Sequence, residues 1–174
     1  MGIPIRILYL APCRPTENAF GTQLRTLQIA SALQTLGQLD FIVVKLEEDG
    51  GEVVHASDSA FAVRRVIKLR PVGARSMLER LRCGLDPKFM GYHGHAAPAE
   101  DRAYVAGELP QYDLVWLHHI RTANALGRWA WPRSVMDVDD VPSTYFRSVL
   151  QSTCSPRARL RARFDLRLAR QRER

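Results

Sequence analysis

Hydrophobic positions along the chain fall into two patterns that alternate from one end to the other. Residues 5–11 form a short, almost continuous apolar run, which is typical of a strand buried in a parallel sheet. Residues 22–36 instead repeat apolar side chains every three or four positions, which predicts a helix with one buried face. The same apolar runs predict four further strands, at residues 39–44, 62–69, 112–118 and 134–138.

The order of these elements predicts the fold class. Helical spacing returns between and after the strands, at residues 53–60, 74–82, 98–109, 122–131, 142–150 and from 156 onward. Strands that alternate with helices favour an α/β fold, with a Rossmann-like open parallel sheet and helices on both faces. We expect Gly37 to end the first helix and residues 83–95, which are rich in glycine, to form a loop.

Charge divides the chain into two parts. The whole chain carries +7, and residues 155–174 hold eight arginines against Asp165 and Glu173, a net +6 that leaves only +1 for the rest. The sequence therefore predicts a nearly neutral Rossmann-like domain over residues 1–154 and an Arg-rich helix over 155–174. Leu160, Phe164 and Leu168 form an apolar stripe on this helix, which predicts a partner surface, a second copy, or a frayed end.

Composition excludes several classes of protein. No apolar run approaches the ~20 residues of a membrane span, and the N-terminus lacks the pattern of a signal peptide. The three cysteines, Cys13, Cys83 and Cys154, are odd in number and widely spaced. This spacing argues against a disulfide framework and favours a reducing compartment. We therefore expect a cytoplasmic protein; peripheral contact with an inner membrane is a separate option, on which the cysteines do not bear.

The first candidate site is the loop that joins the first strand to the first helix. A strand that enters a helix through a glycine leaves free helix N–H groups at the carboxyl edge of the sheet, where anions bind. Gly21, Thr22 and Arg25 are the candidate binding residues there. The loop lacks the glycine patterns of dinucleotide and nucleoside triphosphate sites, so a plain connection is the alternative.

The second candidate site follows the predicted strand at residues 112–118. His118 is suited to act as a base or to hold a hydroxyl, and Arg121 to bind a phosphate through two hydrogen bonds. His118 and the neighbouring His119 point to opposite faces of a strand, so we expect no shared metal ion. Hydrogen bonding that merely ends the strand is the alternative.

The third candidate site is the acidic stretch after residues 134–138. Asp137, Asp139 and Asp140 crowd together, which is costly without a cation, a hydroxyl-rich ligand or helix N–H partners. Two interpretations remain open. In a haloacid dehalogenase type of phosphatase, Asp137 would be the nucleophile and Asp139 the acid and base. Otherwise, Asp139 or Asp140 caps the helix that starts at Pro142.

In order, these stretches resemble the N-terminal half of a glycosyltransferase of the GT-B fold, of the family 4 kind. Residues 5–11 with Pro12, Gly21 and the Ala-Leu before Gly37 resemble that family's first strand, loop and helix, although Phe20 replaces the first of its paired glycines. Residues 112–118 resemble its strand that ends in His-x-His, with Trp116 in place of the first histidine. Residues 136–145 resemble its Asp-hydrophobic-Asp-Asp-x-x-Ser-x-Tyr stretch.

The resemblance implies an acceptor-side domain of an enzyme that transfers a sugar from a nucleotide sugar to a saccharide or lipid-linked acceptor. It implies His118 as the catalytic residue, with His119, Arg121, Asp137, Asp139 and Asp140 among the substrate-binding residues, and no metal or cofactor. It also implies a C-terminal donor-binding domain, so we expect the 174-residue chain to be inactive alone. Two alternatives from other functional classes remain. One is the phosphatase, and the other is a nucleic-acid-binding module that uses the Arg-rich tail; we do not expect the second.

Overall fold

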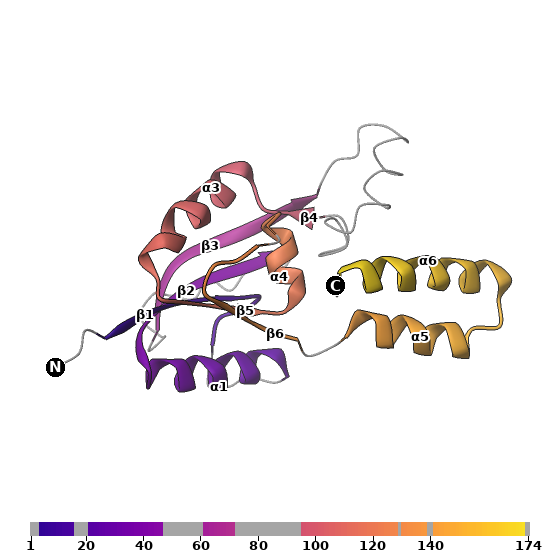
Figure 1. Cartoon of the computed structure of the whole chain (residues 1–174), viewed down its shortest axis with the longest axis horizontal. Coiled ribbons are helices and arrows are strands. Elements are labelled where there is room, and N and C mark those ends of the chain that lie inside the picture. The colour runs from indigo at the N-terminus through magenta and orange to yellow at the C-terminus, as the bar shows by residue number, and fades with distance from the viewer. Residues whose placement is uncertain are drawn as a thin grey trace.

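The chain forms an open, mostly parallel β-sheet with helices on both faces, which is a Rossmann-like α/β fold (Figure 1). This computed structural model describes residues 4–15, 21–46, 61–71, 95–128, 130–138 and 141–172. Its strands are β1 (Ile5–Ala11), β2 (Gly37–Leu46), β3 (Ala62–Pro71), β4 (His95–Ala96), β5 (Leu114–His118) and β6 (Ser134–Asp137). The predicted fold class is therefore confirmed.

The strands lie in the order β4-β3-β2-β1-β5-β6, and every pair is parallel except the short β3–β4 pair at the edge. The chain thus builds outward from β1 through β2 to β3, then crosses over to place β5 and β6 on the other side. The point where this order reverses lies between β1 and β5. In open α/β sheets, ligands bind outside the carboxyl ends of the strands at such a switch point.

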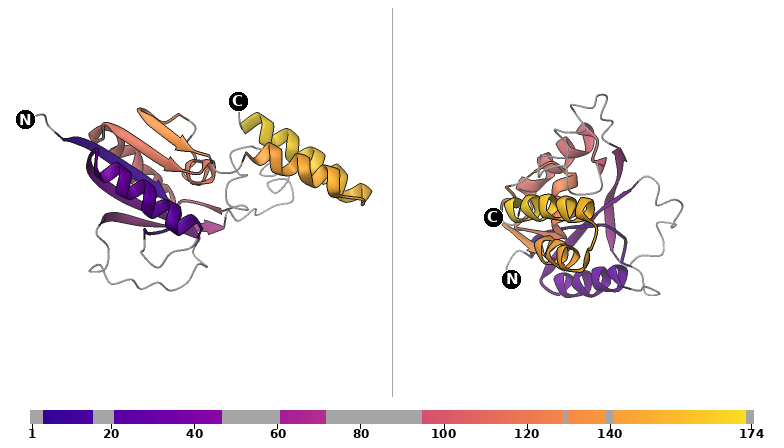
Figure 2. Two further views of the ribbon diagram at one scale, coloured as in Figure 1. Left: turned by 90° about the horizontal axis from the view of Figure 1, so that it is seen from below. Right: turned by 90° about the vertical axis from the view of Figure 1, so that its right-hand side faces the viewer.

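Helices cover the two faces of the sheet. Those that do so are α1 (Thr22–Gln34), α3 (Ala99–Glu108) and α4 (Ile120–Ala125). The described residues also form α5 (Pro142–Ser152) and α6 (Pro156–Arg172), which lie beyond the sheet, and a 3₁₀ turn, η2 (Leu109–Gln111). Figure 2 shows α1 on one side of the sheet, with α3 and α4 on the opposite side. This arrangement places the helix after β1 and the helix after β5 on opposite faces, which opens the crevice at the switch point.

The continuous apolar run of β1 follows from this double cover. Leu8 and Leu10 point into the core beneath α3 and α4, while Ile7, Tyr9 and Ala11 point into the core beneath α1. All five side chains are fully buried. A strand that is buried on both faces needs apolar residues at every position rather than at every second one.

Several sequence predictions needed correction. Gly37 does not end α1 but opens β2, where a Cβ atom would overlap the carbonyl oxygen of Ile5. His95 lies in strand β4, paired with Pro71, rather than in a loop. Helix α4 begins earlier and ends earlier than predicted. The helices predicted at 53–60 and 74–82, and the loop predicted over 83–94, lie outside the described residues.

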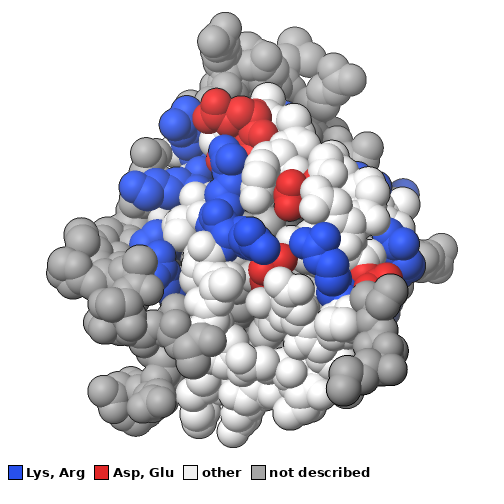
Figure 3. Space-filling model, turned by 90° about the vertical axis from the view of Figure 1, so that its left-hand side faces the viewer, with Lys and Arg blue, Asp and Glu red and all other residues white. Residues whose placement is uncertain are grey.

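Near the amino ends of the strands, a buried carboxylate ties several elements together. Asp40 of β2 accepts hydrogen bonds from Arg64 Nε at 2.8 Å and from the Tyr112 hydroxyl at 2.9 Å. The Arg6 guanidinium lies 3.6 Å from the same carboxylate. Figure 3 shows acidic and basic side chains interspersed on this face. Local neutralisation of this kind stabilises the edge without creating a strong field of one sign.

Helices α5 and α6 form an antiparallel hairpin beyond the carboxyl edge of the sheet. The views in Figures 1 and 2 agree that the two helices lie side by side and extend away from the N-terminus. Their packing buries Ala162, Leu166 and Ala169 of α6. Among the described residues, no helix is both long enough and apolar enough to cross a membrane.

Candidate functional site

The carboxyl edge at the switch point brings residues of all three predicted sites together. Arg25 of α1 donates from Nε and from one terminal nitrogen to the two carboxylate oxygens of Asp137, at 3.0 and 2.6 Å. Asp137 is the last residue of β6, and it lies beside His118 of β5 in the sheet register. The loop site and the acidic site are therefore one constellation, joined by a two-pronged ion pair.

His118 lies at the centre of this constellation but has no exposed surface. Its Nδ1 lies 2.7 Å from the hydroxyl of Tyr9 and 3.4 Å from the hydroxyl of Thr26. The Thr26 hydroxyl in turn donates to the carbonyl of Thr22 at 2.8 Å. This chain of contacts links β5, β1 and the first turn of α1. A catalytic role for His118, as predicted, would require the site to open, because its side chain is fully buried in this structure.

Tyr9 and Thr26 were not predicted as site residues. Burial raises the pKa of Tyr9 above its ordinary value, against the opposing effect of its hydrogen bond with Thr26, and so keeps the phenol neutral. The neutral Tyr9 hydroxyl can either donate a hydrogen bond to His118 Nδ1 or accept one from it, and the tautomer of His118 decides which. The sequence offered a weak signal: two polar groups, on Tyr9 and Thr26, lie within an apolar strand and on the buried side of a helix.

His119 is held in an unusual backbone conformation. Its φ of 71° and ψ of 143° fall in a region that residues with a side chain rarely adopt. The His119 amide donates to the carbonyl of Asp137 at 3.0 Å, and its ring meets that of His118 edge-on at 4.4 Å between centroids. Strained backbone of this kind is concentrated at functional sites, which makes the turn between β5 and α4 a candidate ligand contact.

The N-terminus of α1 completes the edge. Gly21 precedes it with a φ of 57°, and within the described part of the chain no side chain caps the helix and no acidic residue lies in its first turn. Gly21 and Thr22 are exposed. The first N–H groups of a helix have no acceptor within the helix and carry its positive dipole end, so they favour an anion.

The remaining predicted residues divide into two groups. Arg121 is exposed in the first turn of α4, next to His119. Asp139 and Asp140 lie outside the described residues. Among the residues that the structure places, no three His, Cys, Asp or Glu side chains gather closely enough to hold a metal ion.

The geometry of Asp137 bears on the phosphatase alternative. A carboxylate nucleophile needs an oxygen directed at the phosphorus atom of its substrate. Both oxygens of Asp137 instead accept hydrogen bonds from Arg25. This arrangement favours a structural and electrostatic role for Asp137 over a nucleophilic one.

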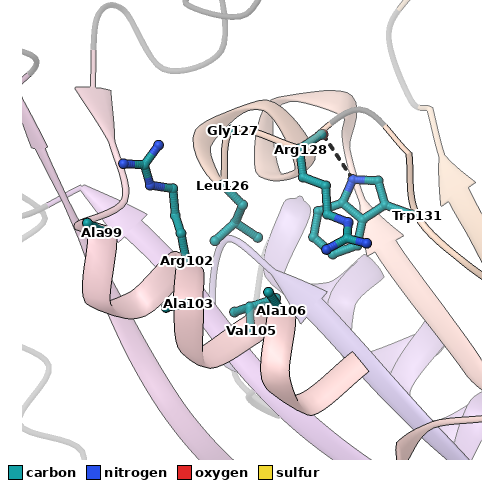
Figure 4. A pocket seen from close by; sticks show the side chains of 9 residues that line it. All are labelled: Ala99, Arg102, Ala103, Val105, Ala106, Leu126, Gly127, Arg128 and Trp131. Carbon is teal, nitrogen blue, oxygen red and sulfur yellow. Dashed lines mark hydrogen bonds between the residues drawn. The ribbon is translucent and has the colours of Figure 1, made fainter. Parts of the chain in front are cut away.

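Away from this edge, a hollow of about 380 Å³ lies between α3 and the segment after α4 (Figure 4). Ala99, Ala103 and Leu126 contribute apolar surface, and Arg128 lies 5.7 Å from the centre of the Trp131 ring. In Figure 4 the Arg102 guanidinium points away from Trp131 and Arg128. The hollow therefore lacks the convergent polar groups that mark a ligand site.

Comparisons with known proteins give little to set beside this geometry. No protein family matches the chain, and no curated protein matches it. Among solved structures, the C-terminal domain of a hydrogenase from Pyrococcus furiosus matches with 16% sequence identity and a TM-score of 0.35. The alignment covers 79% of this chain and 95% of that domain. A likeness this weak supports no conclusion about function.

These findings contradict the resemblance to glycosyltransferase family 4. The comparisons with protein families and with curated proteins found no match, to a glycosyltransferase or to any other protein. The predicted family membership was therefore wrong. The motifs that suggested it are short, and each also follows from ordinary α/β architecture: an apolar strand, a glycine before a helix, and polar residues at strand ends.

Proposed function

We propose that the carboxyl edge between β1 and β5 binds a nucleotide sugar, and that the chain contributes this binding site to a sugar-transfer reaction. The proposal rests on the chemistry of the site and not on membership of any family. The observation that carries it is the Arg25–Asp137 pair, which joins the uncapped start of α1 to the carboxyl end of β6 at the switch point of the sheet.

The phosphates and the sugar of such a ligand have matching groups at this edge. Phosphate oxygens fit the N–H groups of Thr22 and Gln23 at the positive end of α1. Sugar hydroxyls fit the imidazole of His119 and the Asp137 carboxylate, whose side chain is 13% exposed. Arg121, which is exposed on the next helix, adds a further cation for the phosphates.

The buried contacts behind this edge preorganise it. Tyr9, His118 and Thr26 fix the first turn of α1 against β5, so that the groups on the rim keep their positions before a ligand arrives. Rigid support of this kind reduces the ordering cost of binding. The acceptor, a saccharide or a lipid-linked molecule, and any further domain remain part of the proposal, as does a cytoplasmic location.

The test is an NMR titration of the ¹⁵N-labelled chain with UDP-glucose, with free glucose and inorganic phosphate as partial ligands. We expect amide shift changes at Thr22, Gln23 and His119 with UDP-glucose, and changes at Thr22 and Gln23 alone with phosphate. The conservative variant Arg121→Gln should weaken binding of UDP-glucose and phosphate but leave the weak response to glucose unchanged.

The location of the shifts decides the outcome. Changes confined to Arg102, Arg128 and Trp131 would place the ligand in the hollow beside α3 and would contradict the proposal. The absence of any response up to the solubility limit of UDP-glucose would also contradict it. Asp137→Asn tests the phosphatase alternative separately. If the chain releases phosphate from a phosphate monoester and this variant still does so, Asp137 is not the nucleophile.

A further inference from the structure

The outward face of helix α6 has a regular arrangement of apolar and basic side chains. Leu160 is 71% exposed and Phe164 is 41% exposed. They lie four residues apart, so they form one row along the helix. The predicted apolar stripe also included Leu168, but that side chain is buried, which leaves Leu160 and Phe164 as the apolar part of the exposed surface.

Arginines line both sides of this apolar row. Arg157 and Arg161, again four residues apart, lie along one side, and Arg163 and Arg167 lie along the other. All four are exposed, and Arg161 exposes 86% of its side chain. The helix holds seven arginines against Asp165, a net +6. The face opposite this one packs on α5.

From this arrangement we propose that the outward face of α6, defined by Leu160, Phe164 and the four flanking arginines, docks on an anionic phospholipid surface. In this orientation the helix lies parallel to the membrane, with Leu160 and Phe164 in the boundary between headgroups and acyl chains. The arginine side chains extend from both sides of the helix toward the lipid phosphates, and their aliphatic stems cover the apolar surface. Binding at this face is independent of the nucleotide sugar proposed above.

Charge complementarity selects this occupant over the two other candidates. The phosphates of a nucleic acid would pair with the arginines, but they would make no favourable contact with two apolar side chains in the middle of the basic face. A second copy of the chain would cover Leu160 and Phe164 but would bring two helices of net +6 together, which is repulsive. An anionic membrane accepts both the charges and the apolar row.

The test measures co-sedimentation of the 174-residue chain with lipid vesicles. The probes are vesicles of phosphatidylcholine alone and vesicles in which roughly one-third of the lipid is phosphatidylglycerol. We expect binding to the anionic vesicles, little binding to the neutral ones, and a marked loss of binding as salt is raised.

Two sets of substitutions separate the contribution of the arginines to vesicle binding from that of the apolar side chains. Each basic residue near an anionic surface strengthens binding by about fivefold, so Arg161→Gln with Arg163→Gln and Arg167→Gln should weaken it by roughly a hundredfold. Leu160→Ser with Phe164→Ser should also weaken it, although every charge is kept. Both sets change exposed positions, so the circular dichroism spectrum should not change. The melting temperature should fall only slightly, because Arg161→Gln removes an exposed ion pair with Asp165.

The matched control removes three positive charges elsewhere. Lys68→Gln with Arg70→Gln and Arg102→Gln changes exposed residues of β3 and α3 and should leave vesicle binding within about twofold of the original chain. An equal loss in this control would mean that net charge alone governs binding and would overturn the proposal. Equal binding to neutral vesicles would overturn it too.

Two further results would assign the face to another occupant. Salt-dependent binding to duplex DNA that survives Leu160→Ser with Phe164→Ser, without vesicle binding, would indicate a nucleic-acid surface. Self-association in sedimentation velocity that this pair of substitutions abolishes, again without vesicle binding, would indicate a second copy. Either result would refute docking on a membrane.

Discussion

Arg25 and Asp137, 112 residues apart in the sequence, meet through two parallel hydrogen bonds at the carboxyl edge of the sheet. One residue belongs to the helix after the first strand and the other ends the last strand. The pair therefore bridges the two sides of the switch point. It fixes the start of α1 over β5 and β6, where the proposed ligand contacts lie.

This pair should show measurable energetic coupling. We predict a coupling free energy of about 1–2 kcal/mol in a double-mutant cycle of Arg25→Gln and Asp137→Asn, because charge-assisted, two-pronged hydrogen bonds that are partly shielded from water exceed ordinary surface pairs. Urea unfolding of the four proteins measures it. The pair Arg161–Asp165, at 3.9 Å on a single helix, is the comparison, with an expected coupling of about 0.3–0.5 kcal/mol. Equal coupling in the two cycles would show that Arg25 does not rigidify the edge.

Gly37 should be the least replaceable of the described glycines. Gly37→Ala places a Cβ atom against the backbone of Ile5 in the neighbouring strand, so β1 and β2 must separate. We expect a loss of about 3 kcal/mol or more in the free energy of unfolding. Gly107→Ala is the control, since its Cβ meets nothing within 4 Å in helix α3, and it should stabilise the protein by about 0.5–1 kcal/mol. A mild effect of Gly37→Ala would mean that the two strands pair more loosely at this end.

Alkaline pH should destabilise the fold through two buried phenols. Burial raises the pKa of Tyr9 and the pKa of Tyr112 above the ordinary value near 10, and the hydrogen bond from Tyr112 to Asp40 raises the Tyr112 pKa further. Above about pH 10 the unfolded chain releases these protons while the folded chain keeps them, so the free energy of unfolding falls as pH rises. Each phenol contributes up to about 1.4 kcal/mol per pH unit.

Urea unfolding between about pH 9 and 11 tests this dependence. Tyr9→Phe and Tyr112→Phe lose a hydrogen bond at every pH, but each should also make the decline with pH shallower. The double variant should flatten it further, because the two rings lie in separate cores on opposite faces of the sheet. A slope unchanged from the original chain would show that neither phenol stays protonated in the folded state.

The fold was largely predictable because its main signals are local. Apolar runs on β1, β2 and β5 reflect strands covered on both faces, and helical spacing reflects the faces of α1 and α3. The errors occurred where tertiary contacts determine the secondary structure. Gly37 resembles a helix end in sequence, but its role is set by the carbonyl of Ile5, and the two residues of β4 become a strand only by pairing with β3.

The site was predictable as a set of residues but not as an arrangement. Strand ends and helix starts identified Arg25, His118 and Asp137, since parallel strands present their carboxyl ends at one edge. Their pairing joins distant parts of the sequence and depends on strand order, which short motifs do not encode. Tyr9 was missed because an aromatic residue in an apolar strand resembles an ordinary core residue until its hydroxyl is found beside His118.

The strained turn at His119 should lower the stability of the fold while it supports ligand binding. His119→Gly relieves a φ of 71° and should raise the free energy of unfolding by about 1 kcal/mol, while it removes the imidazole and weakens the affinity for UDP-glucose. Arg133→Gly is the control for affinity, because Arg133, which has a φ of 47°, precedes β6 at the opposite edge of the sheet. It should bind UDP-glucose as tightly as the original chain, whereas its relief of strain is offset by the loss of the hydrogen bond from the Arg133 side chain to the Leu109 carbonyl at 3.3 Å. Calorimetric titration and urea unfolding measure the two effects. If His119→Gly gains stability and still binds UDP-glucose as tightly, the strain serves the packing of the turn and not a ligand.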